Sequence, residues 1–173
     1  MDRYASGDAS AFAELYDLLA GRLYAFLLRR TRDASRAEDL VQQTFLQMHC
    51  AREMYTTGGQ VLPWAFCIAR RLSVDAHRKA GREVHDAGED DREAPESCPE
   101  SALREKQAAV LFQKALEALP EPQRLAFELT KYDGLTHAEV ADVLGTTVMA
   151  VKLRVHRTYE VLREASQSRG QAL

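Results

Sequence analysis

The sequence has 173 residues, of which 46% are hydrophobic and 28% are charged, so it can bury one or two small cores and is not a disordered chain. No apolar run approaches the roughly 20 residues that cross a bilayer, and the first ten residues lack the charged-then-apolar pattern of a signal peptide. We therefore expect a cytoplasmic protein. Only nine glycines and no short alternating runs are present, which argues against a β-sandwich or a Rossmann-type sheet and predicts an all-helical chain.

Three cysteines are present, Cys50, Cys67 and Cys98, and no two of them form a CxxC pair. An odd number without such a pair argues against a disulfide framework and against a structural zinc site. We expect these thiols to be reduced and mostly buried, and we expect the chain to hold no metal and no cofactor.

The net charge of −3 at pH 7 conceals a pattern along the chain. Residues 1–82 carry 12 lysines and arginines against 9 acidic residues, residues 83–101 carry 1 against 8, and residues 102–173 carry 10 against 9. The acidic stretch has Pro95, Pro99 and almost no large apolar residue, so it cannot bury itself. The sequence therefore predicts two small helical domains joined by a flexible acidic linker, with boundaries at 1–82, 83–101 and 102–173.

Apolar residues at helical spacing predict a first amphipathic helix of about four turns. Its apolar residues are Phe12, Leu15, Tyr16, Leu19, Leu23, Phe26 and Leu27. A second helix is expected to begin at a capping box formed by Ser35 and Glu38, and to run to about Cys50. Its inward stripe is Ala37, Leu40, Val41, Thr44, Phe45 and Met48. The opposite face is rich in amides and holds Asp39, Gln42, Gln43 and Gln47.

A third helix is predicted from Pro63, because proline fits the first helical turn, where its missing N–H costs nothing. Its apolar line is Trp64, Ile68 and Leu72. The helix and its exit form the most basic stretch of the chain, with Arg70, Arg71, Arg78, Lys79 and Arg82. Tyr55 and Trp64 offer stacking surfaces beside a glycine loop, which suits single-stranded nucleic acid. From charge and aromatic residues alone, a solvated basic face with a core tryptophan is the commoner arrangement.

The second domain is expected to begin near Leu103 with an amphipathic helix that is broken at Pro120. The apolar residues of this helix are Val110, Leu111, Leu116 and Leu119. A further helix then carries Leu125, Ala126 and Leu129.

The stretch 133–157 has the pattern of a helix-turn-helix. Thr136 and Glu139 form a second capping box that opens a short helix. Gly145 permits the tight turn, and Thr147 can cap the next helix. The expected buried residues are Val140, Ala141 and Leu144, then Val148, Val151, Val155, Tyr159 and Leu162.

The second helix of such a motif lies in the major groove and must expose side chains that reach base edges. The exposed candidates are Met149, Ala150, Lys152, Leu153, Arg154, His156 and Arg157. Lysine and arginine suit guanine acceptors or phosphates, and alanine, methionine or leucine suits a thymine methyl group. An ordinary helical hairpin without a DNA-binding role remains the alternative.

Four segments, taken in order, resemble the extracytoplasmic-function sigma factors, which are small two-domain sigma subunits of bacterial RNA polymerase. The segments are FAELYDLLAGRLYAFLLRRT, AEDLVQQTFLQMH, PWAFCIARRLSVDAHRK and ALEALPEPQRLAFELTKYDGLTHAEVADVLGTTVMAVKLRVHR. The resemblance covers most of the chain and implies an all-α fold made of sigma domain 2 and sigma domain 4. It also implies a promoter-specificity subunit that has no catalytic residues and acts on no small-molecule substrate.

The resemblance implies that the first domain binds the clamp helices of the largest subunit of core RNA polymerase, and that the polymerase flap is a second contact. The clamp contacts carried over are Asp39, Gln42, Gln43, Phe45 and Leu46. Gln43 stands where the family more often has an acidic residue, so one attraction to basic clamp residues is weaker here.

The loop from Tyr55 and the helix from Trp64 resemble the family's reader of the minus-ten promoter element, which captures an unpaired base and helps to melt the DNA. The contacts carried over are Leu62, Trp64, Arg71, Asp75, Arg78 and Lys79. Arg71 occupies a position often held by asparagine, which favours a phosphate contact over the usual base contact.

By the same resemblance, the last helix reads the minus-thirty-five element in duplex DNA. The residues carried over are Thr147, Met149, Ala150, Lys152, Leu153, Arg154, His156 and Arg157. Met149, Ala150 and Leu153 depart from the family's usual residues, which leaves the base preference open. The family also implies an inhibitory anti-sigma factor, often membrane-anchored, which could hold the protein at the inner membrane.

Two other functions compete with this interpretation. A stand-alone helix-turn-helix regulator would dimerise or sense a ligand through its first domain and would bind a two-fold DNA site, but it has no need for the amide-rich second helix or the basic third helix. A helical enzyme finds no support, because none of the five histidines has partners at metal-ligand spacing.

Overall fold

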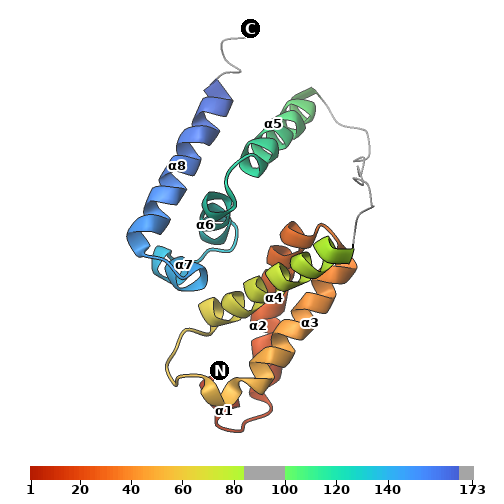
Figure 1. The fold of residues 1–173 in the computed structure, drawn as a ribbon, viewed down its shortest axis with the longest axis vertical. Coiled ribbons are helices and arrows are strands. Elements are labelled where there is room, and N and C mark those ends of the chain that lie inside the picture. The colour runs from red at the N-terminus through yellow and green to blue at the C-terminus, as the bar shows by residue number, and fades with distance from the viewer. Residues whose placement is uncertain (84–99, 168–173) are drawn as a thin grey trace. The chain divides into compact units, whose positions relative to one another are not determined.

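A computed structural model describes residues 1–83 and 100–167, with side chains described over 1–79 and 109–164. Every regular element in these ranges is helical, as the sequence predicts. The helices α1 to α4 belong to one compact unit, and α5, α6, α8 and the first part of α7 belong to another (Figure 1). Most of the predicted acidic linker, and Cys98 within it, lies outside the described residues.

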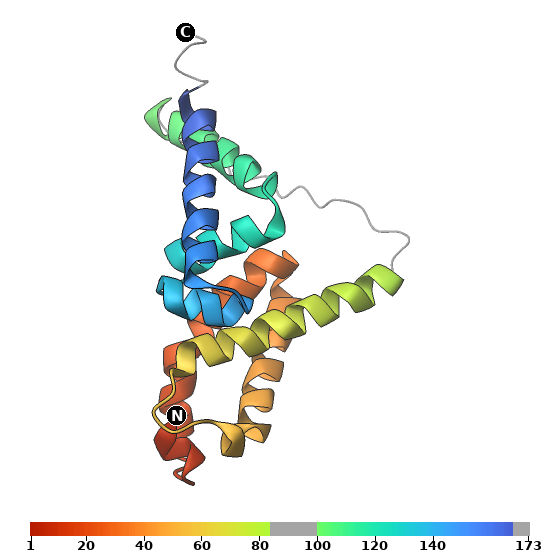
Figure 2. The same ribbon diagram turned by 60° about the vertical axis from the view of Figure 1, so that its left-hand side comes forward.

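The first unit is a bundle of three long helices with two short elements at one end. The long helices are α2 (Ala11–Thr31), α3 (Ala34–Cys50) and α4 (Val61–Glu83), and each packs against the other two. The short elements are the helix α1 (Asp2–Ala5), which the sequence pattern did not predict, and the 3-10 turn η1 (Arg52–Met54). Figures 1 and 2 show α1 and η1 close together at the end of the bundle, and the two are in contact.

Apolar residues at helical spacing build the core of this unit. Leu19, Leu23 and Phe26 of α2 are fully buried, and the Phe26 ring meets the Phe66 ring of α4 edge-on at 5.2 Å between centroids. From α3, the predicted inward stripe is buried in full: Ala37, Leu40, Val41, Thr44, Phe45 and Met48. Such burial is worth about 1.5–3 kcal/mol for each large side chain.

The connection between α2 and α3 corrects one prediction. Arg32 ends α2 with a left-handed φ of 54°, and the extended residue Asp33 starts α3. The Asp33 carboxylate accepts a hydrogen bond from the Arg36 backbone N–H at 3.1 Å. The predicted cap Ser35 is therefore wrong, because the chain turns two residues earlier and Asp33 already receives one of the unpaired N–H groups.

Two further expectations for the first unit need correction. The first long helix has 21 residues rather than about four turns. Tyr16, expected in its apolar stripe, is 46% exposed, because it lies at the edge of the stripe, where its ring still contacts Phe45 of α3. Pro63 does lie in the first turn of α4, which begins two residues earlier at Val61.

The second unit contains α5 (Glu100–Glu117), α6 (Glu121–Lys131), the first part of α7 (His137–Leu144) and α8 (Val148–Gln167). α8 packs against both α5 and α6. One buried cluster of this unit joins α5, α6 and α8 through Leu116, Leu119, Phe127 and Leu162.

Several residues expected in apolar stripes of the second unit are instead at the surface. Val110 and Leu111 of α5 are 53% and 49% exposed, and Val148 and Tyr159 of α8 are 40% and 43% exposed. Thr158 takes the inner position on α8, fully buried, because its hydroxyl donates to the Arg154 carbonyl oxygen at 3.0 Å and so has no need of water.

Two further expectations concern the burial of the cysteines and the lack of a membrane-spanning helix. Cys50 is an exposed free thiol and Cys67 is half-buried, so the expectation of mostly buried cysteines is wrong for Cys50. The reason is that Cys50 is the last residue of α3, beyond the apolar stripe. Among the described helices, none has the length and apolar character needed to span a membrane.

Candidate nucleic-acid and polymerase interfaces

The first candidate surface is the outer face of α3. Asp39, Gln42, Gln43 and Leu46 recur every three or four residues, so the helix carries them on one side, and all of them are exposed. Leu46 is 62% exposed, which is unusual for a leucine in a well-packed helical bundle. The structure therefore assembles an amide-rich face with a protruding apolar residue.

Phe45, the remaining residue carried over for this surface, lies on the other side of the helix. It is 5% exposed, and its ring contacts Phe12 and Tyr16 of α2, with centroids 5.9 and 4.9 Å away. Phe45 thus supports the α3 face from within the bundle and offers little surface of its own.

A shallow depression of about 400 Å³ borders the α3 face. It is lined by Tyr4, Phe12, Tyr16, Gln42, Phe45, Leu46 and His49. Tyr4 and His49 were not predicted from the sequence, and they are joined by a hydrogen bond of 2.5 Å between the tyrosine hydroxyl and the histidine Nδ1. The one available signal was the tyrosine itself, because a buried phenol needs a partner for its hydroxyl group.

The second candidate surface begins with the loop 55–60, which joins η1 to α4. The Gly59 N–H donates to the Thr56 carbonyl oxygen at 2.9 Å, and Gly58 adopts a φ of +79°. A Cβ atom on Gly59 would lie only 2.8 Å from that same Thr56 oxygen. Both glycines are therefore needed for this tight turn.

Tyr55 fastens the loop to the start of α4. Its hydroxyl donates to the Gly59 carbonyl oxygen, and its ring lies 5.2 Å from the Trp64 ring. Burial, together with the nearby Asp2 carboxylate, raises the pKa of Tyr55, so the phenol stays neutral and remains a hydrogen-bond donor. The structure thus brings together the two aromatic residues that the sequence predicted as stacking surfaces.

The outer face of α4 continues from this loop. Trp64 is half-buried, and Arg71, Asp75, Arg78 and Lys79 are exposed at spacings that place them on one side of the helix. Leu62 does not join them, because nine residues before Arg71 is about two and a half turns, on the opposite side of α4. The structure therefore forms a mainly cationic stripe that begins at an aromatic pair.

The helix-turn-helix has the predicted caps. The Thr136 hydroxyl and backbone N–H both donate to the Glu139 carboxylate at 2.7 Å, and the Glu139 N–H returns a bond of 3.3 Å to the threonine oxygen. Gly145 has a φ of +61°, and the Thr147 hydroxyl oxygen accepts from the Ala150 N–H at 3.1 Å. These contacts satisfy N–H groups that the starts of α7 and α8 would otherwise leave unpaired.

The exposed face of α8 is the third candidate surface. It carries Met149, Lys152, Leu153, His156 and Arg157. Met149 is 74% exposed and Leu153 is 46% exposed, which leaves both side chains free of the core. Ala150 and Arg154 are half-buried at the edge of this face, and His156 pairs with Glu160 at 3.4 Å.

The described residues contain no group of three or more His, Cys, Asp or Glu side chains that is arranged to hold a metal ion. The three surfaces are built from amides, cations and aromatic or aliphatic side chains. Such groups can bind phosphates, bases and other helices.

Two family models match the chain. Residues 15–83 match the model described as Sigma-70 region 2, and residues 109–162 match the model described as Sigma-70, region 4. The RNA polymerase sigma factor CarQ of Myxococcus xanthus is 34% identical over 165 residues, which cover 95% of this chain and 94% of that protein. The ECF RNA polymerase sigma factor SigK of Mycobacterium tuberculosis strain H37Rv is 31% identical over 166 residues, which cover 93% of this chain and 88% of that protein.

Solved structures of similar fold come from complexes. The sigma factor RpoE of Bartonella quintana, crystallised with the anti-sigma factor NepR, superposes with a TM-score of 0.71 at 25% identity, covering 92% of this chain and 98% of that one. CnrH, solved with the cytosolic domain of CnrY, superposes with a TM-score of 0.70 at 24% identity, covering 95% of this chain and 92% of that one. This likeness shows a shared fold.

Proposed function

Because this chain belongs to the extracytoplasmic-function sigma factors of the sigma-70 family, we propose that it binds core RNA polymerase and directs it to promoters with two separate DNA elements. The observation that carries the proposal is the order of the matches, with a region 2 segment over 15–83 and a region 4 segment over 109–162 in one chain. Family members are transcription initiation factors, and we assign no reaction to this chain.

The α3 face is the proposed contact with the clamp helices of the polymerase. Asp39 supplies a negative charge, Gln42 and Gln43 supply amide donors and acceptors, and Leu46 supplies an apolar anchor. An apolar residue inside a polar surround is the usual composition of a protein interface. Phe45 acts in this proposal by holding α3 against α2 rather than by touching the polymerase.

The loop 55–60 and the outer face of α4 are the proposed reader of the minus-ten element. An unpaired base can stack on an aromatic side chain, and each such contact is worth about 1–3 kcal/mol, which offsets the cost of unstacking the base. Arg71, Arg78 and Lys79 would neutralise phosphates of the opened strand. The chain would thereby favour the melted over the paired form of the promoter.

The exposed face of α8 is the proposed reader of the minus-thirty-five element in the major groove. Its cations suit phosphates or guanine, and Met149 and Leu153 suit thymine methyl groups. The half-buried Ala150 and Arg154 would contact DNA only at the edge of this face.

An anti-sigma factor is the proposed inhibitory partner. RpoE of Bartonella quintana was solved with such a factor, and the same kind of partner could mask the α3 face or the α4 stripe here. By family, we place the action of this chain in the cytoplasm, where a membrane-anchored inhibitor could hold it at the inner membrane.

The decisive experiment is run-off transcription with core RNA polymerase on a library of randomised promoters. We expect the protein to direct initiation from a two-part motif, and we expect Asp39→Ala with Leu46→Ala to reduce initiation about tenfold or more by weakening the clamp contact.

The matched control is Asp17→Ala with Leu18→Ala on α2, which removes an exposed acid and a leucine of similar exposure (58% against 62%) from the same unit. This control should transcribe as the unaltered protein does. If the protein adds nothing to core polymerase but selects a symmetric DNA site alone, it is a stand-alone regulator instead.

A further inference from the structure

We infer that Asp2 is a positioning residue that holds the loop 55–60 in the conformation that reads the minus-ten element. The inference rests on the proposed function and adds a residue far from the loop in sequence. The Gly58 backbone N–H donates a hydrogen bond of 3.1 Å to the Asp2 carboxylate, across 56 positions of the chain.

The loop needs such a tie because its own contacts are local. Within it, Gly59 bonds Thr56, and the Tyr55 hydroxyl bonds Gly59. These bonds define the shape of the turn, and the contact of the Tyr55 ring with Trp64 holds the beginning of the loop against α4, but neither ties the tip of the loop to another element. The bond from Gly58 reaches a different element, α1, and therefore fixes where the tip of the loop lies.

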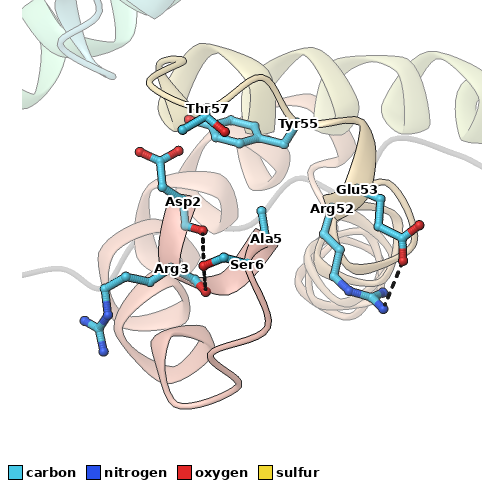
Figure 3. Close-up of a pocket in the computed structure, with 8 residues that line it drawn as sticks. All are labelled: Asp2, Arg3, Ala5, Ser6, Arg52, Glu53, Tyr55 and Thr57. Atoms are coloured by element: carbon cyan, nitrogen blue, oxygen red, sulfur yellow. Dashed lines mark hydrogen bonds and ion pairs between the residues drawn. The ribbon is translucent and has the colours of Figure 1, made fainter.

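A surface depression borders the loop on the side of α1. An open depression of about 420 Å³ lies between α1, η1 and the loop, and its lining is Asp2, Arg3, Ala5, Ser6, Arg52, Glu53, Tyr55 and Thr57. Figure 3 shows the Asp2 carboxylate directed toward the part of the loop that carries Thr57, with Arg52 and Glu53 paired away from it. The Gly58–Asp2 hydrogen bond crosses this depression between the loop and α1.

α1 is itself anchored to the bundle, so Asp2 is a fixed point. The Arg3 guanidinium bonds Asp8 at 2.8 Å and Glu14 of α2 at 2.9 Å. Tyr4 is buried, packs on Phe12 at 5.4 Å between ring centroids, and bonds His49 of α3. Hydrogen bonds from Ser10 and Arg3 also hold the pKa of Asp8 below its ordinary value, which keeps that carboxylate charged.

The bond between Asp2 and Gly58 should affect the discrimination between bases more than the overall affinity for DNA. A loop held in one position receives a base of one shape, whereas a loop free to move accepts several bases at similar cost. Loss of the Asp2 tie should therefore lower discrimination at the minus-ten element while leaving the α8 contact with the minus-thirty-five element unchanged.

The test compares Asp2→Ala with Asp2→Asn in the full chain. Asparagine keeps a carbonyl oxygen that can accept from Gly58, whereas alanine has no acceptor. Asp17→Ala, which removes an exposed acid from α2, controls for charge. Amide hydrogen exchange at Gly58 in the free protein reports the tie, and transcription from promoters with each minus-ten base reports selectivity.

We expect Asp2→Ala to speed exchange at Gly58 and to reduce discrimination between preferred and disfavoured minus-ten bases about three- to tenfold, the range for one hydrogen bond. Asp2→Asn should stay within about twofold of the unaltered protein, and minus-thirty-five preference should be the same in all variants.

Two results would overturn the inference while the proposed function stands: selectivity unchanged in Asp2→Ala, or equal loss in Asp2→Ala and Asp2→Asn. The second result would assign the effect to charge. If the unaltered protein directs no initiation with core polymerase, the proposed function fails and this inference fails with it, even where the exchange data show the tie.

Discussion

Single side chains cap the starts of α3 and α8. Asp33 accepts from the Arg36 N–H at the start of α3, and Thr147 accepts from the Ala150 N–H at the start of α8. Each bond satisfies a backbone donor that the first turn of a helix cannot pair internally. The caps thus determine where α3 and α8 begin, and with them which residues face outward on the two candidate surfaces.

At this scale we predict that Asp33→Ala lowers the free energy of unfolding of the first unit by about 1 kcal/mol. Ser35→Ala, which changes a hydroxyl two residues away, should change it by less than about 0.5 kcal/mol. Urea denaturation followed by fluorescence of Trp64, the single tryptophan of the chain, measures both changes in that unit. Equal losses in the two variants would show that Asp33 is not the working cap.

The element proposed to recognise duplex DNA is α8, and this one helix serves both the core and the candidate DNA surface. Val151 and Val155 face inward, fully buried or nearly so, while Lys152 and Arg157 face outward. The inner residues hold the helix against α5 and α6, so the outer residues are presented on a rigid support. A rigid helix is a better platform for base contacts than a loop.

At the scale of this element, we predict that Lys152→Ala weakens the binding of the reconstituted polymerase to promoter DNA. The slope of the logarithm of the affinity against the logarithm of the salt concentration should become smaller in magnitude by about one. Lys114→Ala removes an equal charge from the exposed surface of α5 and should leave the slope unchanged. Anisotropy titrations between about 50 and 200 mM salt give the slopes. An unaltered slope in Lys152→Ala would exclude this lysine as a phosphate contact.

The whole molecule carries a net charge of −3, although its candidate DNA surfaces are locally basic. Net repulsion from DNA and a small number of phosphate contacts in each unit both argue for weak binding by the free chain. Polymerase would supply further contacts and would hold both units near one promoter, which raises the effective concentration of the second unit once the first is bound.

We therefore predict that the free chain binds a selected promoter at least about tenfold more weakly than the chain bound to core polymerase, with the difference growing as salt is raised. Anisotropy of labelled promoter DNA, with and without core polymerase, measures this. Tight binding by the free chain to a two-fold symmetric site would contradict the prediction and favour the stand-alone regulator.

The sequence by itself determined the helical fold, the helix-turn-helix with its threonine caps, and most of the outward-facing residues of α3 and α8. These features are local, because apolar spacing and a capping side chain act within a few residues of each other. Asp33 and Ser35 are both able to cap the start of α3, and the local sequence pattern does not decide which of them does so. The choice depends on where α2 ends and on the direction in which the chain leaves it.

Only the tertiary structure decided what depends on neighbours distant in sequence. The exposure of Tyr16, Val110 and Tyr159 follows from how far the facing helices reach over them, and spacing within one helix carries no such information. The bond between Asp2 and Gly58 joins residues 56 positions apart and exists because the bundle brings α1 beside the loop. The sequence thus indicates the candidate surfaces, and the packing of the bundle decides which side chains hold them in place.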